Sequence, residues 1–203
     1  LRSTFPWPII LDSGQHSYLP LPPWDDGGPQ PSLARVWPDG SVDALLETDE
    51  EFLRPWKASL DRDWELLVFV PGGHLANLPV QSDLIRFDAS GELDTSYRAR
   101  SADGVSLKLF DFAEAPGDEG GVWAVGDIDS TPSMIHRLDD TGLAVETIEF
   151  EAVDVDGSAA NLHAIAADAE SLFVAGGFDR IDGVLSPGVA RLSPSGVGDP
   201  AWG

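Results

Sequence analysis

One stretch of this sequence occurs four times with the same spacing between an arginine and a glycine. In the last copy, Arg191 stands five residues before Gly196, and Asp199 follows three residues after that glycine. The earlier copies begin at Arg35, Arg86 and Arg137. The steps from one arginine to the next are 51, 51 and 54 residues. A period of this size, running from end to end, predicts a fold built from repeated units.

The spacing around each glycine is typical of a β-hairpin with a three-residue loop. Such a loop is usually a type I turn followed by a residue in the left-handed region, where glycine has no Cβ to clash. Counting back along the two strands from this glycine places each arginine opposite the residue eight positions later. The predicted cross-strand pairs are Arg35 with Asp43, Arg86 with Asp94, and Arg191 with Asp199.

These pairs have a structural role to fill before any functional one. Opposite charges that face each other across two strands contribute roughly 0.2–1 kcal/mol and help to fix the register. The third copy departs from the pattern, because Val145 stands where the acid is expected. The sequence therefore predicts that Arg137 lacks this partner.

The segments between the hairpins predict short strands. Leu66–Val70 is a continuous apolar run, as expected of a strand buried on both faces, and no segment of helical length has an apolar stripe of helical period. A unit of about 50 residues has the size of one four-stranded β-propeller blade. We therefore predict an all-β fold, with one β-propeller domain over residues 1–203. Its repeats span approximately 6–47, 48–98, 99–150 and 151–203, and they either close a four-bladed ring or form part of a larger ring.

The composition restricts the classes of partner. The formal net charge is −23, from 35 acidic and 12 basic residues. Such a surface repels phosphate groups, so neither nucleic acid nor an anionic membrane surface is an expected partner. No apolar run is long enough to insert into a membrane. The absence of cysteine removes disulfides, thiolate catalysis and cysteine metal sites together.

The fourth copy resembles a known repeat. Phe173–Phe178, followed by Val189–Leu192, the Gly196 turn and Asp199–Trp202, is similar to the delta-60 repeat, a β-propeller repeat of bacterial surface and secreted proteins. Residues 69–73 with 84–97 resemble it too, and the first and third repeats match mainly at the hairpin. The resemblance implies a propeller fold and an extracytoplasmic location. It implies no particular chemistry, because the family is defined by its structure.

Acidic loops are the candidate metal sites. Asp103, Asp154 and Asp156 precede predicted inner strands, which in a propeller places them near one mouth of the central channel. Converging oxygen ligands there could hold Ca²⁺, which takes six to eight of them. However, the segment lacks the rest of a twelve-residue calcium loop, and aspartate next to glycine is also ordinary turn chemistry.

Other candidate features have similar structural explanations. Acidic loops also occur at Asp25–Asp26, Asp127–Asp129 and Asp179–Asp182, and ordinary solvated turns are the first explanation for them. The seven tryptophans could stack on sugar rings or fill the spaces between blades. The four histidines fall at different places within their repeats, and no nucleophile elbow, zinc-protease motif or phosphate loop occurs.

The sequence therefore predicts a non-enzymatic binding or structural module of an extracytoplasmic bacterial protein. One alternative is a calcium-stabilised carbohydrate-binding or adhesion module. Another is a glycoside hydrolase whose site lies at the channel mouth, around Asp103 or Asp156. A protein or a carbohydrate is the expected partner, and self-association is expected if the ring is incomplete.

Overall fold

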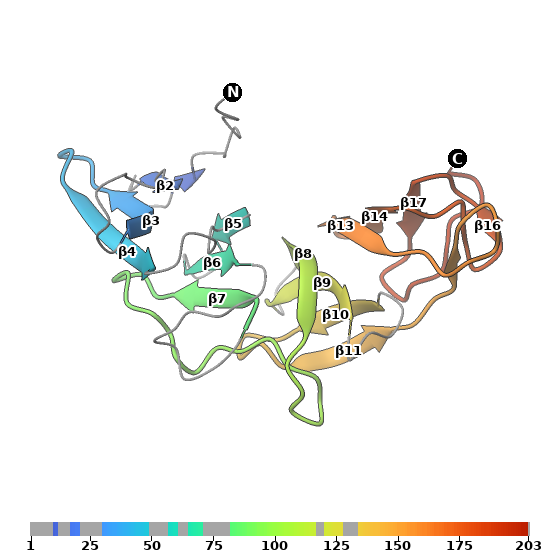
Figure 1. Cartoon of the computed structure of the whole chain (residues 1–203), viewed down its shortest axis with the longest axis horizontal. Helices are drawn as coiled ribbons and strands as arrows, with labels where there is room; N and C mark the ends of the chain where they lie inside the picture. The colour runs from blue at the N-terminus through green and yellow to red at the C-terminus, as the bar shows by residue number, and fades with distance from the viewer. Residues whose placement is uncertain are drawn as a thin grey trace. The chain divides into compact units, whose positions relative to one another are not determined.

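The computed structural model describes residues 10–11, 17–20, 30–48, 57–60, 65–70, 82–116, 120–127 and 134–202. The chain divides into two compact units, Leu1–Ser96 and Tyr97–Gly203, which we describe separately (Figure 1). The described residues form strands and turns and contain no helix, so none of them belongs to a helix that could span a membrane. The all-β prediction is confirmed for this part of the chain. The single domain, the repeat count and the closed ring stay predictions.

The first unit contains two antiparallel sheets whose strands follow one another in sequence (Figure 1). The first sheet consists of β1 Ile10–Leu11, β2 Ser17–Pro20, β3 Gln30–Val36 and β4 Val42–Thr48. The second sheet consists of β5 Lys57–Leu60, β6 Leu66–Phe69 and β7 Leu84–Phe87. Strand β6 lies in the predicted apolar run, and all four of its residues are buried. Tyr18 and Leu33 of the first sheet share a core with Val68 and Phe87 of the second.

The second unit contains three antiparallel sheets. A four-stranded sheet consists of β8 Lys108–Glu114, β9 Val122–Asp127, β10 Met134–Leu138 and β11 Ala144–Ile148. A three-stranded sheet consists of β13 Leu162–Ala167, β14 Leu172–Gly176 and β17 Val189–Leu192. A smaller sheet has the order β12-β15-β16, formed by β12 Ala152–Val153, β15 Arg180–Ile181 and β16 Val184–Leu185.

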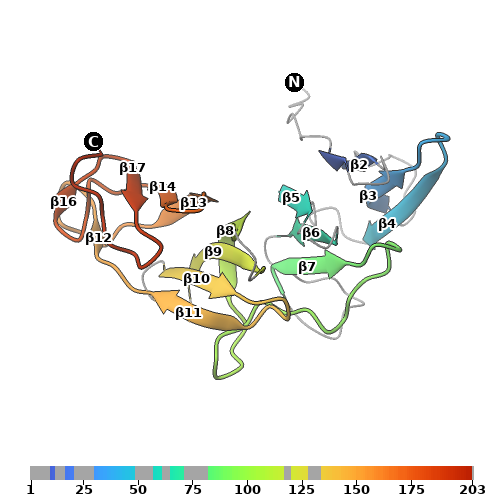
Figure 2. The same cartoon turned by 180° about the vertical axis from the view of Figure 1, so that it is seen from behind.

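The two larger sheets of the second unit bury a common core. Trp123 and Ile135 from the four-stranded sheet pack with Val174 and Leu192 from the three-stranded sheet. Strand β13 lies beside β8 and β9 (Figure 2). There the amide of Ile165 in β13 donates a hydrogen bond of 2.9 Å to the Asp111 carboxylate of β8. This side chain satisfies a backbone donor of the neighbouring sheet.

The four predicted hairpin glycines adopt the expected backbone. Gly40, Gly91, Gly142 and Gly196 have φ angles of +85°, +88°, +81° and +86°. In the first hairpin, the Gly40 N–H donates to the carbonyl of Trp37 at 2.9 Å, and the Trp37 N–H donates to the carbonyl of Ser41 at 2.9 Å. Only glycine accepts such a φ without a steric cost, which explains its fixed place in each copy.

The third hairpin differs from the prediction because it contains a β-bulge. The register shifts between Arg137 and Leu138, so that Glu146 lies opposite Arg137 and Ala144 lies opposite Leu138. Val145 is the extra residue, and 56% of its side chain is exposed. The prediction that no acid faces Arg137 was wrong, because a simple count of positions assumes an unbroken ladder.

The fourth repeat contains a hairpin where the sequence predicted a loop. Strands β15 and β16 pair with each other, and β15 also pairs with β12. Asp182 and Gly183 join β15 to β16 with φ angles of +48° and +77°, as a two-residue hairpin loop requires. Part of the acidic set at Asp179–Asp182 therefore shapes a turn.

The prediction of four strands per repeat holds for the first and third repeats. In the described residues of the second and fourth repeats, three strands form each sheet. Single bridges, Phe87 with Leu93 and Leu192 with Gly198, occur where a fourth strand would begin.

Candidate functional site

The acidic loops predicted as calcium ligands have the same turn as the arginine hairpins. The Ser101 N–H donates to the Val105 carbonyl, and the Gly104 N–H donates back to Ser101, at 2.8 and 2.9 Å. The loop from Asp154 to Ser158 repeats both hydrogen bonds, each at 2.9 Å. The structure therefore adds two turns of this type to the four that the sequence predicted.

The carboxylates of these two loops accept hydrogen bonds within their own turns. Asp103 accepts one from the Ser101 hydroxyl, Asp154 one from the Val155 amide at 2.6 Å, and Asp156 one from the Ser158 amide at 2.9 Å. The hydrogen bond from Ser101 lowers the pKa of Asp103, and those from Ser158 lower the pKa of Asp156.

Within the ranges that the structure describes, no three acidic or histidine side chains lie together as a metal ion would require. The calcium site at Asp103, Asp154 and Asp156 remains a prediction. Asp25, Asp26 and Asp129 lie outside the described residues.

The structure brings Arg86 and Asp94 together as an ion pair. The Nη2 and Nε atoms of Arg86 lie 2.5 and 3.0 Å from Oδ2 of Asp94, and Glu65 lies 2.9 Å from Nη1. Burial raises the pKa of Asp94, but hydrogen bonds from Ser96 and Arg86 outweigh this effect and lower the pKa to about 2. The Arg86–Asp94 ion pair therefore connects the two sides of the second hairpin.

Arg191 and Asp199 lie across the fourth hairpin in a looser arrangement. Nη1 of Arg191 is 3.6 Å from Oδ2 of Asp199, and both side chains are about one-third exposed. The Nε atom of Arg191 donates to the Ser171 hydroxyl at 2.8 Å. Surface ion pairs of this kind contribute little to stability. We therefore infer that the main role of this pair is to fix the register of the hairpin.

Arg35 makes a contact that the sequence did not predict. The register places it opposite Asp43, whose side chain lies outside the described part of the structure. The Arg35 guanidinium donates to the carbonyls of Ala89 and Ser90 in the next hairpin, at 3.3 and 2.7 Å. It also lies 4.6 Å from the centroid of the Trp37 ring. Arg35 thus fastens one repeat to the following one.

Two other hairpin glycines also lie against the preceding repeat. A Cβ at Gly142 would overlap the carbonyl of Arg98, and a Cβ at Gly196 would overlap the side chain of Ile148. A Cβ at Gly91 would lie 2.9 Å from the guanidinium of Arg35. These glycines therefore serve both the turn and the packing between repeats.

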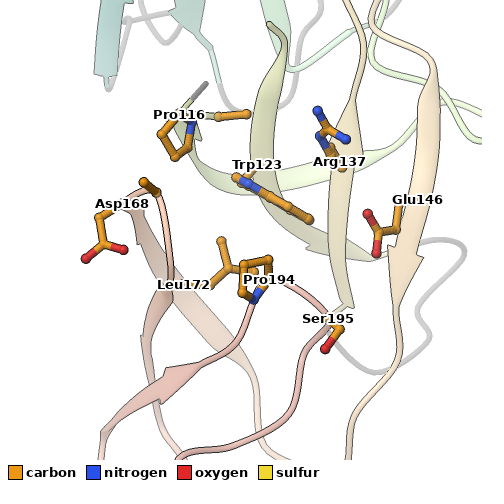
Figure 3. A pocket seen from close by; sticks show the side chains of 10 residues that line it. Pro116, Trp123, Arg137, Glu146, Asp168, Leu172, Pro194 and Ser195 are labelled. Atoms are coloured by element: carbon orange, nitrogen blue, oxygen red, sulfur yellow. The ribbon is translucent and has the colours of Figure 1, made fainter. Parts of the chain in front are cut away.

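An open groove lies between the four-stranded and three-stranded sheets of the second unit (Figure 3). Its volume is about 360 Å³. One wall is a row of side chains that face one another across β9, β10 and β11, namely Trp123, Arg137 and Glu146. The opposite wall comes from two turns of the fourth repeat, with Asp168 and Ser195 among its residues. Each of these residues is labelled in Figure 3.

The groove combines an apolar floor with a charged rim. Leu172 and most of the Trp123 ring are buried, and only 6% of Trp123 is exposed. The guanidinium carbon of Arg137 lies 6.0 Å from the centroid of the Trp123 ring. Glu146 and Asp168 are exposed. The bulge in the third hairpin is what places Glu146 in this row, because the unbroken register would present Val145 instead.

The described tryptophans pack mainly within the protein. Trp123 belongs to the core, Trp37 lies under Arg35, and Trp202 forms an edge-to-face pair with Phe173, with ring centroids 5.7 Å apart. The remaining tryptophans lie outside the described residues, at Trp7, Trp24, Trp56 and Trp64.

A family model matches the chain over two of its hairpin regions. The family is described as a domain of unknown function (DUF5122) with a β-propeller fold, and the matched residues are 24–45 and 171–201. These segments contain the hairpins of Arg35 and Arg191. The comparison with curated proteins gives no match. In its first and last repeats the chain is therefore similar to a family of β-propeller repeats.

Proposed function

We propose that this chain is a non-enzymatic β-propeller module that binds a ligand in the groove between its third and fourth repeats. The observation that carries the proposal is the row of Trp123, Arg137 and Glu146. This row faces two turns of the next repeat across a groove of about 360 Å³. Most binding sites in proteins are concave, with an apolar floor and a few polar groups. The matched family is one of β-propeller domains without an assigned activity.

The chemistry of the groove fits a carbohydrate best. Charged planar side chains such as Arg137, Glu146 and Asp168 can hydrogen-bond to hydroxyl groups, since they supply paired donors or acceptors. Proline side chains offer apolar surface to the C–H face of a sugar ring, and the exposed Pro116 and Pro194 line the groove above the buried Trp123. A cell-surface or secreted location suits this ligand and the acidic composition, and we place the protein there.

The displaced pKa values favour binding over glycoside hydrolysis. A glycosidase needs a carboxylic acid whose pKa is raised, so that it can protonate the leaving oxygen. In the part of the chain that the structure describes, each carboxyl with a displaced pKa is shifted downward. Asp103 and Asp156, the predicted candidates for catalysis, are among them.

Titration of the chain with a panel of neutral and amino-sugar oligosaccharides tests this proposal. We expect isothermal calorimetry to detect binding of at least one of them. Replacing Glu146 by Gln should weaken that binding about tenfold, because the variant loses a charge-assisted hydrogen bond at the groove rim.

The matched control is Glu149→Gln, since Glu149 is exposed and does not line the groove. It should bind as tightly as the unchanged protein. The groove is not the ligand site if both variants bind equally well. If no saccharide binds and none is hydrolysed, the carbohydrate proposal fails.

A further inference from the structure

The groove of the second unit has a counterpart at the junction of the first and second repeats. There the guanidinium of Arg35 donates to the carbonyls of Ala89 and Ser90, at 3.3 and 2.7 Å. Both carbonyls belong to the turn of the second hairpin, and Arg35 is only 4% exposed. Hydrogen bonds from an ionised donor are stronger than those between neutral groups. The turn of the second hairpin is therefore a binding site for a cation, which the first repeat supplies.

The fourth hairpin has the same turn, and this turn lines the groove. Pro194 and Ser195 stand at the same positions before the hairpin glycine as the two carbonyl residues of the second turn. The glycines of the two turns have φ angles of +88° and +86°, and both turns close with the same two backbone hydrogen bonds, of 2.8 or 2.9 Å. Pro194 and Ser195 lie on the groove wall that faces Trp123 (Figure 3). This wall therefore contains the two residues whose counterparts bind a cation in the second hairpin.

The side chains of the groove carry more negative than positive charge. Arg137 lies opposite Glu146 in the neighbouring strand, so these two charges offset each other. Among the described residues that line the groove, Asp168 is the one other charged side chain. The amide of Glu170 donates to Oδ1 of Asp168 at 2.9 Å, which holds this carboxylate in the turn between β13 and β14. With a net charge of −23 on the whole chain, the groove favours a cation over an anion.

The two acids of the groove lie apart from each other. Figure 3 shows Asp168 and Glu146 on opposite sides of Trp123, with Pro194 between them. A ligand that reaches both acids must therefore present polar groups at two places and an apolar face between them. A chain of sugar rings has this pattern, because C–H groups cover the faces of each ring and polar substituents surround its rim. The groove volume of about 360 Å³ fits a short segment of such a chain, since sites for small molecules measure roughly 300–1,000 Å³.

We propose that the groove binds a cationic saccharide, namely an oligosaccharide of amino sugars. Its ammonium groups lie against Asp168 and against the carbonyls of Pro194 and Ser195, the positions at which the second hairpin holds a guanidinium. This inference rests on the proposed function, because it specifies the charge of the saccharide that the same groove binds. A neutral sugar gains nothing from the excess of acid, and a sugar acid is repelled by it.

Three linear trisaccharides with one common linkage separate the charge of the ligand from its shape. They are built from glucose, glucosamine or N-acetylglucosamine, so that a hydroxyl, an ammonium or an acetamide group stands at the same ring carbon. Each is titrated into the full chain by isothermal calorimetry in a slightly acidic buffer of low salt, where the amine is protonated. We expect the glucosamine trisaccharide to bind at least about tenfold more tightly than the other two, because its hydrogen bonds are charge-assisted. This preference should shrink as NaCl is raised, because salt screens the attraction between opposite charges.

Asp168→Asn tests whether the preference arises in the groove. The variant removes one charge but keeps an oxygen that can accept from the amide of Glu170, so the turn is retained. It should reduce the preference for glucosamine over glucose about fivefold, since a charged hydrogen bond becomes a neutral one. Glu170→Gln is the matched control, because it removes the same charge from the same turn and Glu170 does not line the groove. Its preference should equal that of the unchanged protein.

The outcomes distinguish this inference from the proposed function. If the glucose and glucosamine trisaccharides bind equally well, the inference is wrong, whereas the groove still binds a saccharide. If no saccharide of this set or of the wider panel binds, the proposed function fails and the inference fails with it. A linear triamine that binds as tightly as the glucosamine trisaccharide also overturns the inference, because the groove would then bind charge without a sugar ring. Equal losses of preference in Asp168→Asn and Glu170→Gln would likewise overturn it, since the cation would not lie in the groove.

Discussion

At the scale of single residues, His136 is an ionisable side chain in a fully buried position. It is fully buried in the middle of β10, and its Nδ1 atom lies 3.1 Å from the Thr147 hydroxyl. Its Nε2 atom is buried, with no hydrogen-bond partner within the described residues. Burial lowers the pKa of His136 from 6.5 to about 4, because the charged ring would lose its hydration.

This histidine should make the protein less stable in mild acid. The unfolded chain binds a proton near pH 6.5 and the folded chain only near pH 4, so the free energy of unfolding falls as the pH drops between these values. The loss amounts to at most roughly 3 kcal/mol. His136→Leu should remove this part of the pH dependence. Urea unfolding at pH 7, 5.5 and 4.5 measures the free energy of unfolding of both proteins. If this free energy changes equally with pH in the unchanged protein and in His136→Leu, the pH dependence does not come from His136.

At the scale of structural elements, the hairpin glycines differ in what surrounds them. Gly40 and Gly91 have nearly the same φ, but no atom lies within 4 Å of a Cβ built on Gly40, whereas one on Gly91 would press on the Arg35 guanidinium. Gly40→Ala should lower the free energy of unfolding by roughly 1–2 kcal/mol, because alanine is strained in the left-handed region. Gly91→Ala should cost roughly 1–3 kcal/mol more, because it also disturbs the contact with Arg35.

Chemical unfolding of both alanine variants measures this difference. The Gly40 variant is the control, since it has the backbone strain without the clash. Equal losses of stability would mean that Arg35 moves aside freely and does not fasten the two repeats.

The hairpins also mark how far the sequence could predict the fold. Turn position and register follow from the spacing of Arg86, Gly91 and Asp94, because a left-handed glycine and a cross-strand pair are local requirements. The bulge after Arg137 was missed, since an extra residue in one strand leaves the local pattern nearly unchanged. The hairpin at Asp182–Gly183 was missed although its signal was present, an Asp-Gly pair between Ile181 and Val184.

The candidate site was less predictable than the fold. Residues of the groove come from six separate segments, and Glu146 reaches it only because of the bulge. The acids that the sequence singled out, Asp103 and Asp156, lie in turns and accept their hydrogen bonds there. A short motif cannot distinguish a turn aspartate from a metal ligand, because both tasks use the same carboxylate next to glycine.

At the scale of the whole molecule, the calcium prediction can be decided by thermal unfolding. A cation that binds only the folded state raises the midpoint, and the stabilisation grows with the logarithm of its concentration once this exceeds the dissociation constant. Binding at Asp103, Asp154 and Asp156 should therefore raise the midpoint in CaCl₂ above that in NaCl of equal ionic strength. Asp156→Asn should abolish the increase. Equal midpoints in the two salts would contradict a calcium site.

The turns of Gly91, Gly142 and Gly196 lie against the repeat before them, and these contacts restrict how a protein of this kind can change in length. The interval between consecutive arginines varies from 51 to 54 residues, while the interval from arginine to glycine stays at five. A residue inserted inside such a turn would lift Gly142 or Gly196 off its neighbour and loosen two repeats with one mutation. Insertions are therefore expected to survive in the segments between hairpins, which leaves those segments as the places where new loops can be added.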